Sequence, residues 1–80
     1  MIGILNIGGL IFVKDGEASD KYIETYRAEA DLRSFRIKVD RTLNPPYYEL
    51  FEEWKEGGRA MHKCLFATSS LSKMLNRRII

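Results

Sequence analysis

The first residues of the chain form two short apolar runs separated by a pair of glycines. Residues 2–7 and 10–14 are rich in β-branched and apolar side chains, and they flank Gly8-Gly9. Two glycines tolerate the positive φ that a tight hairpin turn requires. The pattern therefore predicts an N-terminal β-hairpin, and a single strand bulged at the glycines is the alternative.

Residues 33–40 show the clearest strand pattern in the sequence. Phe35, Ile37 and Val39 alternate with polar residues, which is the two-residue period of a strand that has one solvated face. The preceding segment, residues 21–31, fits a strand by residue type and a helix by apolar spacing. Both interpretations of that segment stay open.

The segment 46–56 predicts a helix. Pro46 suits a first helical position, and Gly57-Gly58 suits a helix end. Four apolar residues at spacings of three, four and seven form one stripe: Tyr47, Leu50, Phe51 and Trp54. We expect this stripe to pack on the predicted sheet, so that replacing Trp54 by alanine costs about 3–5 kcal/mol.

The last third of the chain also has apolar residues at helical spacing. A break is expected at Thr68-Ser69-Ser70, because these residues are better helix caps than helix interiors. A strand over residues 60–67 is the alternative. The fold class expected from the whole pattern is α+β: a small antiparallel sheet, made of the hairpin and strand 33–40, packed against helix 46–56 and a further helical C-terminal segment.

Length and composition predict one domain spanning residues 1–80. An apolar fraction of 45% is what a single small core needs. The lone cysteine, Cys64, cannot form an internal disulfide, which favours a reducing, cytoplasmic compartment. The apolar run 1–13 is too short to span a bilayer and lacks the basic start of a signal peptide, so no membrane association is expected.

Charge is distributed unevenly along the chain. Residues 1–56 hold all eleven acids and eight bases, whereas residues 57–80 hold five bases and no acid. Such asymmetry indicates an anionic partner for the C-terminal third, or pairing of that third with the acidic segment before it.

No catalytic or metal-binding motif reaches the strength of a prediction. Ser70 and Lys73 have the Ser-x-x-Lys spacing of some serine hydrolases, but a serine that opens a short helix is an ordinary cap. His62 and Cys64 supply two of the four ligands that structural zinc normally takes. The sequence thus predicts no enzyme activity, no cofactor and no bound metal.

Charged residues at the surface are the remaining candidates for function. Basic side chains on the solvated face of strand 33–41 and in the C-terminal segment are compatible with nucleic-acid binding, and the glutamates of 46–56 with a contact surface for a basic partner. The expected partner-binding residues are Arg36, Lys38, Glu49, Glu53, Arg59, Lys63, Lys73, Arg77 and Arg78.

By elimination, the sequence favours a small protein-binding domain that inhibits or regulates a larger protein. Small domains without chemistry of their own often do this, including those made by phages and other compact genomes, although that step is an analogy from size. Nucleic-acid binding is the alternative. A homodimer formed through the N-terminal strand is also compatible with the sequence.

Overall fold

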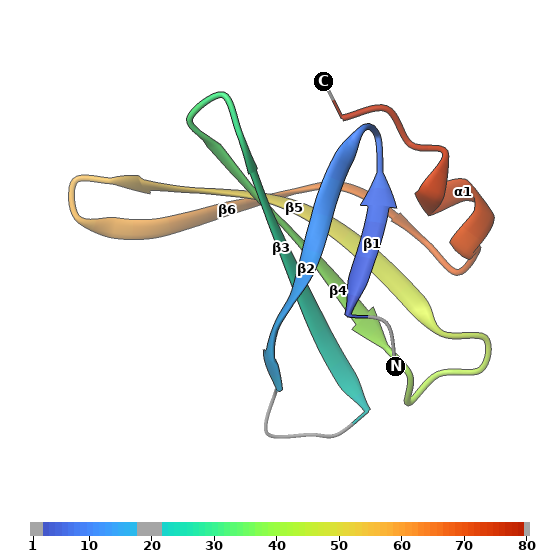
Figure 1. Cartoon of the computed structure of the whole chain (residues 1–80). Helices are drawn as coiled ribbons and strands as arrows, with labels where there is room; N and C mark the ends of the chain where they lie inside the picture. Colours follow the sequence, from blue (N-terminus) through green and yellow to red (C-terminus); the bar gives the residue numbers. More distant parts are fainter. Residues whose placement is uncertain (1–2, 18–21, 80) are drawn as a thin grey trace.

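The computed structural model describes residues 3–17 and 22–79, and these form one antiparallel sheet with a short helix after it (Figure 1). Each of the six strands pairs with its neighbour along the chain, so the strand order is β1-β2-β3-β4-β5-β6. The elements are β1 (Ile4–Ile7), β2 (Leu10–Glu17), β3 (Ile23–Ala30), β4 (Arg33–Asp40), β5 (Tyr47–Glu56), β6 (Arg59–Thr68) and α1 (Leu71–Leu75).

The expected α+β fold class is wrong, because the molecule is mostly β. The segment 46–56, predicted as a helix, lies almost entirely in strand β5. Within β5 the two buried residues are Tyr48 and Leu50, which are two apart as on one face of a strand. Trp54 does not pack on the sheet as a helical stripe requires, and it remains 41% exposed.

The expected helical C-terminal segment is also mostly wrong. Residues 60–67 lie inside β6, in agreement with the strand alternative for them. Helix begins only after Ser70, whose hydroxyl accepts a hydrogen bond from the backbone N–H of Lys73 and so caps α1 as predicted. Arg77 and Arg78 follow the helix rather than forming its last turn.

The N-terminal hairpin and the strand at 33–40 are confirmed. β1 and β2 pair from Ile4 opposite Val13 to Ile7 opposite Leu10, around the two glycines. The ambiguous segment 21–31 contains strand β3, apart from its first residue, which lies outside the described residues.

The turn from β3 to β4 contains no glycine. Asp31 and Leu32 adopt φ values of 51° and 64°, and they join Ala30 to its cross-strand partner Arg33. A side chain in this left-handed region is strained, and aspartate tolerates it better than leucine does. Leu32 is therefore held at the hairpin tip by the pairing on either side of it, where it is fully exposed.

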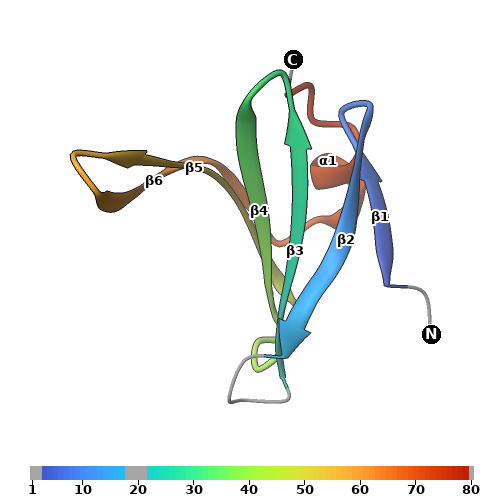
Figure 2. The same cartoon turned by 60° about the vertical axis from the view of Figure 1, so that its left-hand side comes forward.

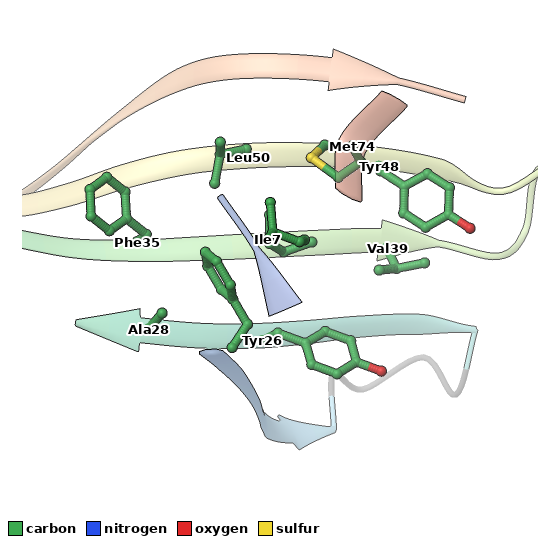
Figure 3. Close-up of a cluster of buried hydrophobic side chains, with 10 residues drawn as sticks. Ile7, Tyr26, Ala28, Phe35, Val39, Tyr48, Leu50 and Met74 are labelled. Atoms are coloured by element: carbon green, nitrogen blue, oxygen red, sulfur yellow. The ribbon is translucent and has the colours of Figure 1, made fainter. Parts of the chain in front are cut away.

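The core lies on the inner face of the curled sheet and is closed by α1. The helix contacts both β1 and β6, and its Met74 is fully buried. Figure 3 shows Met74 and Ile7 directed into the same space as the side chains of the central strands. The buried cluster comprises Ile7, Phe12, Tyr26, Ala28, Phe35, Ile37, Val39, Tyr48, Leu50 and Met74.

The outer half of the β5–β6 hairpin extends beyond the rest of the sheet. Pairing of β4 with β5 ends at Ser34 opposite Glu53, but β5 and β6 stay paired as far as Glu56 opposite Arg59. We call this two-stranded extension, residues 54–61, the arm. Figures 1 and 2 show it projecting from the sheet, and in Figure 2 it leaves on the side opposite β1 and α1.

Candidate interaction surface

The outer face of β4 carries ion pairs that neutralise its basic side chains. Arg36 donates from Nε to Glu53 and from Nη1 to Asp15, each at 2.9 Å. Lys38 lies 4.0 Å from Glu49. Four of the expected partner-binding residues, Arg36, Lys38, Glu49 and Glu53, are thus brought together by the register of β4 and β5, but they face one another.

A second set of ion pairs lies at the two ends of β4, one with β5 and one with β3. Arg33 donates to both carboxylate oxygens of Glu52, at 2.9 and 3.0 Å, and this hydrogen bonding holds the pKa of Glu52 below its usual range. The nearby charge of Lys63 acts in the same direction. Arg41 donates from Nε to one carboxylate oxygen of Glu24, and the pKa of Glu24 is also lowered. These carboxylates are fixed as anions, so they do not suit general acid–base chemistry near neutral pH.

The basic residues of the C-terminal third form no such pairs with any other residue that the structure describes. Every described cation from Lys14 to Arg41 is in an ion pair, whereas no ion pair within residues 3–17 and 22–79 involves Lys55 or a later cation. Glu49, Glu52 and Glu53 of β5 form ion pairs with β4, whereas no ion pair of Glu56 is seen within the described residues. Among the described residues, no ion pair joins the C-terminal cations to the acidic segment before them.

The five C-terminal cations lie on separate elements. Arg59 and Lys63 lie on β6, and Lys73 lies in α1. Arg77 and Arg78 line a polar hollow of about 510 Å³ beside the β1–β2 turn, and the guanidinium carbon of Arg77 is 4.8 Å from the centre of the Phe66 ring. The five cations are thus spread over β6, α1 and the residues that follow α1.

A groove lies in the corner between the arm and the outer face of the β3–β4 hairpin. It has a volume of about 640 Å³. Its floor comes from β3 and β4 and its wall from the arm and the start of β6, so segments far apart in sequence meet there. The lining residues include apolar Leu32, Trp54 and Met61 next to basic Arg27 and Lys55.

The apolar residues of this groove are the feature that the sequence interpretation missed. Trp54 and Met61 are cross-strand partners on the arm, and they are 41% and 36% exposed. A signal was available, because Gly57-Gly58 repeats the Gly-Gly pair that marks the first hairpin. Its position after a helical stripe made it resemble a helix end instead.

The residues considered for chemistry lie on two elements, His62 and Cys64 on β6 and Ser70 and Lys73 at α1. The Ser70 hydroxyl is engaged as the cap of α1. His62 packs edge-on against Phe51 with 5.7 Å between ring centres, and the exposed Cys64 thiol approaches the carbonyl of Phe66. Among the described residues, no three His, Cys, Asp or Glu side chains are grouped to hold a metal ion.

Comparisons with protein-family models, with curated proteins and with solved structures give no match to this chain. In the part of the chain that the structure describes, no helix has the length and apolar character needed to cross a membrane.

Proposed function

We propose that this chain is a small non-catalytic protein-binding domain that inhibits or regulates a larger protein, and that it contacts this partner through the arm and the adjoining groove. The observation that carries the proposal is the exposed pair of Trp54 and Met61 on an extension that adds nothing to the buried core. Tryptophan in such a position is the residue type most enriched among binding hot spots.

The arrangement of the groove supports a protein rather than a small molecule as the ligand. Leu32, at the tip of the β3–β4 hairpin, lines the same groove as the arm, so three exposed apolar side chains from two hairpins lie around one hollow. Apolar anchors surrounded by charged residues are typical of protein interfaces. An exposed thiol at Cys64 fits the reducing cytoplasmic compartment that we propose for the protein.

Nucleic-acid binding is the second candidate, and the unpaired cations of the C-terminal third favour it. Against it, Arg36 and Lys38 are occupied by carboxylates, which would repel a phosphate backbone. These ion pairs weaken the case for strand 33–41 as a nucleic-acid contact. What remains is a set of cations spread over β6, α1 and the last residues.

A comparative pull-down from the native host tests the proposal. The baits are the unaltered chain, a Trp54→Ser/Met61→Ser arm variant, and a Leu43→Ser control that changes an apolar residue outside the arm that is 51% exposed. We expect a protein partner to be retained by the first and third baits and lost by the arm variant. Equal retention by all three baits, or recovery of nucleic acid alone in a salt-sensitive form, would contradict the proposal.

A further inference from the structure

The outer edge of β6 is open along the part that leaves the sheet. β6 is the last strand in the order, and no backbone hydrogen bond within residues 3–17 and 22–79 reaches its outer side between Arg59 and Cys64. All six residues of this stretch, which we call the β6 edge segment, are exposed. Unpaired N–H and C=O groups in a row are a template for an added strand.

The side chains of this segment follow a regular pattern of charge. Arg59, Met61 and Lys63 alternate on one face as cation, apolar residue and cation. On the inner side of β6, the residues of β5 opposite them are Glu56, Trp54 and Glu52. A strand added on the outer side with acid, apolar residue and acid at alternate positions would place opposite charges beside Arg59 and Lys63.

The cations of the segment form no ion pair with β5 among the described residues. Both carboxylate oxygens of Glu52 are engaged by Arg33, and within the described residues neither Lys63 nor Arg59 forms an ion pair. The β6 edge segment contains no acidic residue. A strand that brought acids to the outer side of β6 would thus meet two free cations, one on each side of Met61.

A second copy of the chain is a poor occupant of this edge. Antiparallel pairing of two β6 strands centred on Met61 would place Arg59 of each copy opposite Lys63 of the other. Like charges directly opposite each other destabilise a strand pair. The charge pattern selects a different chain that is acidic.

We infer that the β6 edge segment accepts, by antiparallel strand addition, an extended acidic segment of the partner protein with acid, apolar residue and acid at alternate positions. This inference rests on the proposed function and specifies the chemistry of the partner. The apolar residue of the added strand lies beside Met61, and its acids lie beside Arg59 and Lys63. Main-chain hydrogen bonds supply the affinity, and the two charge pairs supply the register.

The inference is tested with a capped peptide that contains Glu-Thr-Trp-Thr-Glu, titrated into the ¹⁵N-labelled chain while backbone amide shifts are followed. We expect the amides of the β6 edge segment to shift, and a Lys-Thr-Trp-Thr-Lys peptide to leave them unchanged. Replacing both Arg59 and Lys63 by glutamine should weaken binding about tenfold or more. Exchanging both for glutamate should reverse the preference between the two peptides, and unchanged core amides would show that the variants are folded.

N-methylation of the peptide separates strand addition from simple charge attraction. Only alternate amides of an added strand point toward β6. Methylating one alternate set should abolish binding, whereas methylating the other set should leave it within about twofold. Equal tolerance of both sets, equal binding of the two charge patterns, or shifts confined to other strands would overturn the inference.

The two proposals fail in different ways. If the native partner binds only when Trp54 and Met61 are present, but the peptide does not bind β6, the proposed function is supported and strand addition is wrong. If a single-stranded oligothymidylate displaces the bound peptide and shifts the amides of the β6 edge segment, this edge binds nucleic acid and the inference is wrong. A pull-down that is indifferent to the arm removes the proposed function, whatever the peptide does.

Discussion

The two glycine pairs of this chain make nearly identical turns in opposite surroundings. Gly8 and Gly9 adopt φ values of 58° and 81°, and Gly57 and Gly58 adopt 58° and 79°. A Cβ at Gly8 would meet the carbonyl oxygen of Arg77 at 2.6 Å, whereas a Cβ at Gly57 would meet nothing within 4 Å. The first hairpin is packed into the molecule, and the second ends in open space.

The side chains of the two hairpins differ in the same way. Ile7 and Phe12 of the first hairpin are fully buried, whereas Trp54 and Met61 of the arm are each more than one-third exposed. The same local turn therefore joins strands with buried side chains in the first hairpin and strands with exposed side chains in the arm. Stability should depend on the first hairpin, and partner binding on the second.

The largest expected difference is between the aromatic residues of the two hairpins. Phe12→Ala removes a fully buried ring and should lower the free energy of unfolding by about 3–5 kcal/mol. Trp54→Ala should cost less than about 1 kcal/mol, because mainly the cross-strand contact with Met61 is lost. This replaces the larger cost expected when Trp54 was placed on a packed helix. Urea unfolding followed by far-UV circular dichroism gives both values, and similar costs would erase the distinction between the regions.

A smaller difference is expected between the two matched glycines. Gly57→Ala should cost only the left-handed strain of an L-residue, about 1 kcal/mol. Gly8→Ala adds a clash with backbone to the same strain and should cost about 2–4 kcal/mol. Thermal melts of the two variants measure the gap. If Gly57→Ala were the more damaging change, the tip of the arm would not lie in open space.

Local patterns predicted the first hairpin but not the second, for a physical reason. Around Gly8-Gly9 the residue types indicate strands, and both interpretations, a hairpin and a single bulged strand, are β. Before Gly57-Gly58, the spacing of Leu50, Phe51 and Trp54 fits a helix. In β5, Leu50 faces the core and Phe51 the outer face, because pairing with β4 and β6 decides the conformation there.

The charged surface shows a similar limit. The sequence identified the basic and acidic residues, but only the register of β4 against β5 reveals that Arg36 meets Glu53 and Lys38 meets Glu49. Contacts between strands are not encoded in the spacing along one strand. Without that register, occupied cations such as Arg36 could not be told from unpaired ones such as Arg59 and Lys63.

The smallest expected effect is a change in the pKa of Glu52, which lies where β5 leaves the packed sheet and continues into the arm. Glu52 lies one residue before the last β4–β5 pair, and the hydrogen bonds from Arg33 hold its pKa low. A carboxylate with a lowered pKa adds stability above the pKa of the unfolded chain, about 4.3, and this contribution disappears as the pH falls through the lower folded value. Arg33→Gln should raise the pKa of Glu52 toward its usual value and flatten the loss of stability on acidification.

Lys63→Gln is the matched control on the other side of Glu52. Its charge acts on Glu52 without a hydrogen bond, so it should raise the pKa of Glu52 by less than Arg33→Gln does. Carbon-detected NMR titration of the Glu52 carboxylate measures both shifts. A larger response to Lys63→Gln would mean that β6, rather than the β3–β4 hairpin, holds Glu52. Lys63 would then be an internal partner of β5 and would no longer be free to meet an incoming acid.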